Sequence, residues 1–248
     1  MKKLAFLFTA LLLLTSCSKG YKVTVSFPDD SVNGETAFLT NYDTGDTLLS
    51  ATVENNACTF EGKTDKGFFA RLLVGGNRYG FIVEPGDVKL DIANGNAVSP
   101  LNDKLAAWSK EMQKLADDST ITEAEGDARY AEGLLKFYQD NKDNAIGPWA
   151  FCNYLMYKDF TEADIDAMLK DAPAEYAQLK RVAKAKDAAR QLKVTAEGQK
   201  FTDFEVPAAD GTVQKLSDYV GKGKVTLVDF WASWCGSRSE KRRVGKEC

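Results

Sequence analysis

Alternating apolar and polar residues mark the first part of the chain. The alternation is clearest in residues 23–27, 49–53 and 88–92. A period of two predicts strands with one buried face and one solvent-exposed face. Turn-forming pairs separate these segments, among them Asn33-Gly34, Gly75-Gly76 and Pro85-Gly86. Short strands at this spacing predict an antiparallel β-sandwich or barrel, which we assign to a β-rich domain at residues 17–97.

After Pro100 the apolar period changes to three and four residues, which is typical of an amphipathic helix. The apolar stripe of the first helix consists of Leu101, Leu105, Trp108, Met112 and Leu115. A second helix is expected through residues 130–138, weakened by Gly126 and Gly133. The pair Gly147-Pro148 is expected to break the chain before the next apolar segment.

Further helix signals follow. Thr161 and Asp164 have the spacing of a capping box, and Pro173 suits the first turn of another helix. Basic residues recur at helical spacing in residues 180–193, which predicts a solvated face rather than an anion site. Residues 98–195 are therefore predicted to be a helical linker region.

A different pattern appears near the C-terminus, where an apolar and β-branched run begins at Val225 and reaches Trp231, with Asp229 as its one charged residue. Such a run predicts a strand buried on both faces of a parallel sheet. Cys235 would then lie at the carboxyl end of that strand, at the start of a helix. The helix N-terminus favours the thiolate, which is the nucleophilic form of cysteine.

Two other cysteines are predicted to be buried and inert. Cys58 occupies an inward-facing strand position, and Cys152 lies among aromatic and aliphatic residues, a setting that raises a thiol pKa. A set of aromatic residues at strand spacing is assigned to the core rather than to a ligand groove: Phe68, Phe69, Tyr79 and Phe81.

The first sixteen residues have a short basic start and an apolar segment too short to span a bilayer comfortably, which predicts an export signal. Leu14-Thr15-Ser16-Cys17 resembles the bacterial lipobox, in which the cysteine is acylated and becomes the mature N-terminus. We therefore expect Cys17 to carry the lipid anchor of a cell-envelope protein on the periplasmic side of a bacterial membrane.

The amino-acid composition excludes several kinds of catalytic and metal-binding site. The chain of 248 residues has no histidine, which excludes histidine-dependent nucleophilic catalysis and histidine-ligated metals. Its five cysteines include no C-x-x-C pair, so neither a metal nor another cofactor is expected. The net charge is −4, and residues 17–237 are more acidic because both ends are rich in Lys and Arg. An acidic body argues against nucleic-acid binding.

The sequence V-T-L-V-D-F-W-A-S-W-C-G at residues 225–236 resembles the active-site strand of the thioredoxin superfamily. Together with residues 198–224 it is similar to the TlpA and ResA kind of thiol–disulfide oxidoreductase, with its AhpC/TSA-like domain. The resemblance implies that Cys235 is the nucleophile, that Asp229 assists proton transfer and that Trp234 shields the thiol. It also implies protein disulfide substrates and a membrane thiol reductant as partners.

The β-rich part also resembles a domain of unknown function, DUF4369, that precedes thioredoxin-like domains in envelope lipoproteins. The resemblance depends on C-T-F-E-G at residues 58–62 and F-I-V-E-P-G-D at residues 81–87. The residue patterns and the two resemblances together predict an α+β protein of several domains, with an antiparallel β-sandwich or barrel, a helical segment and an incomplete thioredoxin-like domain at residues 196–248.

The C-terminus departs from that family. Ser237 and Arg238 follow W-C-G where the family has proline and a second, resolving cysteine. Residues 238–248 reverse the charge of the preceding chain and resemble translated sequencing adapter, which indicates an artificial tail on a truncated gene. The strand at residues 225–231 would then lack its sheet partners, with its apolar faces exposed.

Three functions remain open at this point. The first is a thiol–disulfide oxidoreductase, inactive as this chain because the resolving cysteine is missing. The second is a non-enzymatic envelope lipoprotein that binds a partner through its β and helical parts. The third is a peroxiredoxin-like peroxidase, which ranks lower because its cysteine usually follows a proline-and-threonine approach.

Overall fold

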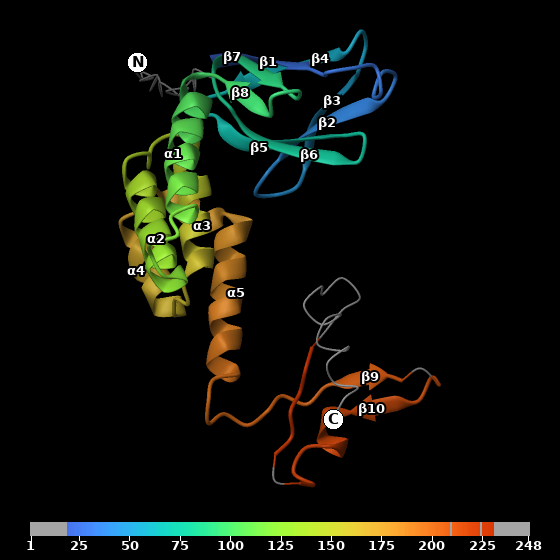
Figure 1. Ribbon diagram of the computed structural model, residues 1–248, viewed down its shortest axis with the longest axis vertical. Coiled ribbons are helices and arrows are strands. Elements are labelled where there is room, and N and C mark those ends of the chain that lie inside the picture. The colour runs from blue at the N-terminus through green and yellow to red at the C-terminus, as the bar shows by residue number, and fades with distance from the viewer. Residues whose placement is uncertain (1–18, 209, 224, 231–248) are drawn as a thin grey trace, which may run out of the picture. The chain divides into compact units, whose positions relative to one another are not determined.

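The computed structural model describes residues 19–208, 210–223 and 225–230 (Figure 1). Contacts divide the chain into two compact units, Met1–Lys193 and Val194–Cys248. The first unit contains a β-sandwich and the helices α1 to α5, so the predicted α+β class is confirmed.

In residues 19–98 the described strands form two four-stranded sheets, with the orders β4-β1-β7-β8 and β3-β2-β5-β6. The strands are β1 (Lys19–Ser26), β2 (Thr36–Asn41), β3 (Thr47–Thr52), β4 (Ala57–Thr64), β5 (Phe68–Val74), β6 (Asn77–Val83), β7 (Gly86–Asp91) and β8 (Asn96–Val98). Figure 1 shows the two sheets facing each other across a shared core.

Alternation decides which side chains enter that core. Along β1, every second residue from Tyr21 is buried, and Val23 and Val25 are fully enclosed. Cys58 on β4 faces inward with 6% of its surface exposed, and Phe81 on β6 is also buried. Both core assignments are therefore confirmed.

One strand pair differs from the predicted antiparallel arrangement. β7 pairs with β1 in parallel, with Val23 opposite Val88 and Val25 opposite Leu90. The chain leaves the first sheet after β4 and forms the β5–β6 hairpin of the other sheet. It then returns beside β1, on the side opposite β4. The alternating pattern reports burial but not strand direction, so it could not reveal this crossover.

Five α-helices follow in the described part of the first unit. They are α1 (Pro100–Ala116), α2 (Glu123–Gln139), α3 (Ile146–Tyr157), α4 (Glu162–Lys170) and α5 (Lys180–Val194), with a 3-10 helix η1 (Ala174–Gln178) before α5. The stripe of α1 packs on the helical core through Leu101, Leu105 and Trp108. The Thr161–Asp164 capping box is present at the start of α4.

The predicted chain break at Gly147-Pro148 is wrong, because both residues lie in the first turn of α3. Proline is tolerated in the first turn because its missing N–H would have no helical partner there. Helix α3 is apolar on nearly all sides and contributes Ile146, Ala150, Phe151 and Leu155 to the helical core. An all-round apolar helix has to be enclosed by its neighbours.

Helix α1 is fixed to the sandwich by polar contacts. The Ser99 side chain makes no N-cap hydrogen bond, and the Glu84 carboxylate takes that place by accepting from Leu101 N at 2.7 Å. The Ser99 hydroxyl also donates to Glu84. A carboxylate at a helix N-terminus satisfies an orphan N–H and is favoured by the helix dipole.

The second unit has little regular structure in its described residues. β9 (Glu205–Pro207) and β10 (Val213–Lys215) pair only with each other there, and η2 (Leu216–Asp218) follows. Residues 225–230 are neither helix nor strand, and Val225 and Leu227 are 88% and 90% exposed. Residues 225–230 therefore do not form the buried strand that the pattern predicts for a complete sheet. No neighbouring strand lies among the described residues, and the exposed apolar side chains agree with the expectation for a segment without its sheet partners.

Candidate functional site

Of the residues that the sequence assigns to the redox site and the lipid anchor, the structure describes Asp229. Cys17, Trp234 and Cys235 lie outside the described residues. Asp229 lies in the exposed segment 225–230. Their assignment therefore stays a prediction from the sequence.

The cysteines that are described, Cys58 and Cys152, are free and buried. Burial raises the pKa of the Cys58 thiol to about 11 and that of Cys152 to about 12, because a desolvated thiolate is unfavourable. Both predictions of inert thiols agree with this setting, since only the thiolate is a good nucleophile.

A cleft that the sequence did not predict lies where the β2–β3 loop and β5 meet α3 and α5. The loop is shaped by Asn41, whose side-chain oxygen accepts hydrogen bonds from Asp43 N at 2.8 Å and Thr44 N at 3.0 Å. This Asx turn, together with Gly45 at φ 77°, fixes the direction of the Asp43 side chain.

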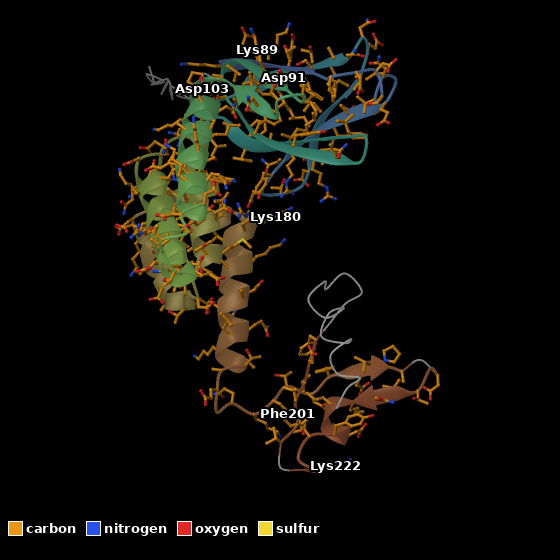
Figure 2. All side chains as sticks on the ribbon, in the orientation of Figure 1. Lys89, Asp91, Asp103, Lys180, Phe201 and Lys222 are labelled. Atoms are coloured by element: carbon orange, nitrogen blue, oxygen red, sulfur yellow. The ribbon has the colours of Figure 1, made fainter. Side chains whose placement is uncertain are left out.

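Asp43 caps helix α5 from a distance of more than a hundred residues in sequence. Its two carboxylate oxygens accept hydrogen bonds from Lys180 N at 2.8 Å and Arg181 N at 3.0 Å. The Lys180 ammonium also donates to the carbonyl of Thr44 at 3.1 Å. Figure 2 shows Lys180 at the end of α5 nearest the sandwich. The cap thereby fixes the start of α5, and Arg181 with it, against the loop.

The ring of Tyr42 lies at the centre of the cleft. The guanidinium carbon of Arg71, from β5, is 4.0 Å from the ring centroid, and that of Arg181 is 5.0 Å from it. The ring also makes an edge contact with Phe69, which in turn stacks on Trp149 of α3 at 5.3 Å. Two cations thus share one aromatic ring that rests on an aromatic stack.

The cleft has two lobes, which share Tyr42, Asp43 and Arg181. The smaller lobe, about 220 Å³, is walled by Phe69, Trp149 and Cys152. The ion pair between Lys66 and Glu175, 2.9 Å long, lines the same lobe, and hydrogen bonding to Lys66 holds the pKa of Glu175 below its ordinary value. The Tyr176 hydroxyl, which donates to the Lys142 carbonyl, has a raised pKa because it is buried.

The larger lobe, about 420 Å³, runs along α5. Its floor is apolar and includes Leu155, Ile165 and Ala189, while Arg71, Lys158, Arg181 and Lys184 supply positive charge. A volume of this size is within the range of small-molecule sites. Phe69 and the neighbouring Phe68 line the smaller lobe, although the sequence assigned them to the core alone.

This arrangement suits binding better than catalysis. Among the residues that the structure describes, no three Asp, Glu or Cys side chains are grouped as ligands for a metal ion. The thiol in the cleft is protonated, and both oxygens of Asp43 accept backbone hydrogen bonds. The cleft therefore presents cations and apolar surface rather than a paired nucleophile and base.

Two sequence signals could have pointed to the cleft. Arg71 is the one charged residue in the apolar strand F-F-A-R-L-L-V. Helix α5 begins after Leu179, which cannot cap it, so the cap had to come from elsewhere in the chain. Neither signal identifies the residue that is contacted, which is Tyr42 for Arg71 and Asp43 for the start of α5. Only the folded chain brings these residues together.

No helix among the described residues has the length and apolar character needed to cross a membrane. This finding concerns spanning helices alone.

Comparison with known proteins identifies one domain. A family model described as "Domain of unknown function (DUF4369)" matches residues 21–124. No curated protein and no solved structure matches the chain. The match continues past the sandwich and α1 to the first residues of α2, so it includes the α1 attachment through Glu84. Residues 21–124 of this chain are therefore a DUF4369 domain.

Proposed function

We propose that this protein is a lipid-anchored thiol–disulfide oxidoreductase of the bacterial cell envelope, with Cys235 as its nucleophile. The observation that carries the proposal is the sequence V-T-L-V-D-F-W-A-S-W-C-G at residues 225–236, with its thioredoxin-like W-C-G ending. The DUF4369 domain at residues 21–124 supports it, because the sequence resemblance associates such domains with thioredoxin-like ones in lipoproteins.

The reaction has two steps. The Cys235 thiolate attacks one sulfur of a substrate disulfide, which forms a mixed disulfide, breaks the substrate bond and leaves the other sulfur to take a proton. A second thiol then attacks the Cys235 sulfur and releases the substrate as a dithiol. Asp229 would assist the proton transfer, and Trp234 would form part of the substrate surface.

The second step needs a thiol that position 238 does not supply, since it is arginine. An external thiol, such as that of a membrane-bound reductant, has to resolve the mixed disulfide and provide the electrons. We therefore expect the chain as it stands to stop at the mixed disulfide and to be inactive in turnover.

Reactivity of the thiol tests the proposal. Mass spectrometry would follow alkylation of Cys235 by iodoacetamide as a function of pH, with Cys248 as an internal reference. We expect Cys235 to react faster than Cys248 below the ordinary cysteine pKa of about 8.5, because its thiolate is stabilised. Equal rates at every pH would remove Cys235 as the nucleophile.

Insulin reduction with dithiothreitol tests the resolving step. Arg238→Cys is expected to give turnover above that of the unmodified chain, and Cys235→Ser is expected to abolish the mixed disulfide. The same turnover in the Cys235→Ser variant would contradict the proposed role.

The anchor has its own test. We expect Cys17→Ala to prevent acylation and to move the protein from the membrane to the soluble fraction of the envelope, since stable anchoring needs the acyl chains. Unchanged processing and membrane association would exclude Cys17 as the lipid attachment site.

A further inference from the structure

We propose that the larger lobe of the cleft, between β5, the α3–α4 connection and α5, binds an organic anion that has a carboxylate or phosphate head and a short apolar body. This binding is independent of Cys235 and of the thiol chemistry proposed above. It depends on an arrangement of charge and apolar surface within the first unit.

The charge of the lobe is opposite to that of the protein. Its cationic side chains are Arg71, Lys158, Arg181 and Lys184, against the two acids Asp43 and Asp159. Both carboxylate oxygens of Asp43 already accept hydrogen bonds from the start of α5. The lobe therefore carries a positive excess on a chain whose net charge is −4.

Two of these cations lie over one aromatic ring. Both guanidinium carbons lie within 5.0 Å of the same Tyr42 centroid. Across residues 19–208, no ion pair engages Arg71 or Arg181, and the only side-chain hydrogen bonds of Arg181 are to Asn153 and Met156. Each guanidinium is therefore available to pair with an anion in the lobe. Their planar forks match carboxylate and phosphate oxygens.

The remainder of the lobe suits an apolar body. Leu155 and Ile165 form a buried floor, and Ala185 and Ala189 leave room above the helix backbone. Met156 lines the same lobe with 70% of its surface exposed. An inorganic anion would contact only the cationic side chains, and a neutral apolar molecule would contact only the apolar floor. A molecule with an anionic head and an apolar body should therefore bind best.

Isothermal titration calorimetry of the full chain tests this assignment with four probes: octanoate, octyl phosphate, octanol and inorganic phosphate. We expect octanoate and octyl phosphate to bind at least about tenfold more tightly than octanol or inorganic phosphate. The ratio of octanoate to octyl phosphate affinity distinguishes a carboxylate from a phosphate head. Equal affinity for octanol and octanoate would overturn the role of the cations.

Variants locate the site. Arg71→Gln and Arg181→Gln should each weaken octanoate binding by about tenfold or more. Arg78→Gln, at an exposed arginine on the adjacent strand β6, should leave it unchanged. Arg71 is the decisive position, because its guanidinium lies over the Tyr42 ring at the cleft. Binding that is unaffected by Arg71→Gln would overturn the proposal.

Two controls distinguish this site from the thiol chemistry and from a membrane surface. Cys235→Ser should bind octanoate as the unmodified chain does, so loss of redox activity and loss of anion binding are distinguishable. Vesicles of phosphatidylglycerol test a membrane surface as the source of the anion. Vesicle binding that depends on Arg71, without binding of free octanoate or octyl phosphate, would overturn the assignment to a small ligand.

Discussion

The side-chain amide of Asn102 on α1 satisfies both backbone groups of Ile82 on β6. The Ile82 N–H donates to Asn102 Oδ1 at 2.9 Å, and Asn102 Nδ2 donates to the Ile82 carbonyl at 2.7 Å. β6 is an edge strand of its sheet, and the amide takes the place of a neighbouring strand at this point. Both residues are buried, at 3% and 0% exposure, so water cannot substitute for the amide.

Replacing that amide should destabilise the first unit. We expect Asn102→Ala to lower the free energy of unfolding by about 2–4 kcal/mol, because it leaves two buried backbone groups without partners. Urea denaturation followed by circular dichroism measures the change. Asn94→Ala, at an exposed asparagine, should change it by less than about 0.5 kcal/mol. Similar losses in the two variants would show that the Ile82 contacts contribute little.

Two glycines in helices should respond in opposite directions to alanine. A Cβ at Gly147 would overlap the Tyr176 hydroxyl and the Asn141 carbonyl, whereas one at Gly126 would meet Ile121 at an ordinary 3.7 Å. We expect Gly147→Ala to destabilise the protein by more than about 2 kcal/mol and Gly126→Ala to stabilise it by about 0.5 kcal/mol. Thermal unfolding of both variants checks the pair. A stable Gly147→Ala protein would contradict the close packing of α3 on Tyr176.

The buried thiols of Cys58 and Cys152 should not react with alkylating reagents under native conditions. With the pKa of Cys58 raised to about 11 and that of Cys152 to about 12, almost no thiolate exists near neutral pH. We expect iodoacetamide to label both residues orders of magnitude more slowly in buffer than in concentrated guanidinium chloride. Peptide mass spectrometry measures each site separately. Rapid labelling of Cys152 in buffer would contradict the burial of its thiol in the wall of the cleft.

The capping box of α4 should make stability depend on pH in the acid range. Hydrogen bonds from the Thr161 side chain and then from its backbone N–H hold the pKa of Asp164 below its ordinary 3.8. A lowered folded-state pKa means that the carboxylate stabilises the fold above pH 3.8 and that this contribution is lost as the pH falls through the lower, folded value. Urea titrations of the unmodified chain and of Asp164→Asn should therefore converge on acidification. Thr161→Ala removes the partner and should reduce the same pH dependence, so an unchanged profile in both variants would contradict the assignment.

Local patterns were sufficient for most elements of the first unit. Alternation located β1, β3 and β7, the apolar stripe located α1, and Thr161 with Asp164 located the start of α4. They failed at Gly147-Pro148, which locally favour a break in the helix. Both residues are helical because the other helices bury the apolar surface of α3, and this packing outweighs the local preference. At residues 225–230 the pattern predicts a strand that needs sheet partners, and the described residues supply none.

The sequence by itself determined which residues are buried in the sandwich and the helices, and it supplied the thiol chemistry proposed for Cys235. Burial follows from the period of apolar residues, which is a local property of the chain. Only the tertiary structure decided the parallel pairing of β1 with β7, the caps that Glu84 and Asp43 provide to α1 and α5, and the meeting of Arg71 with Arg181 at Tyr42. These contacts join residues far apart in the chain, and their energy depends on distances that exist only after the sheets and helices have packed.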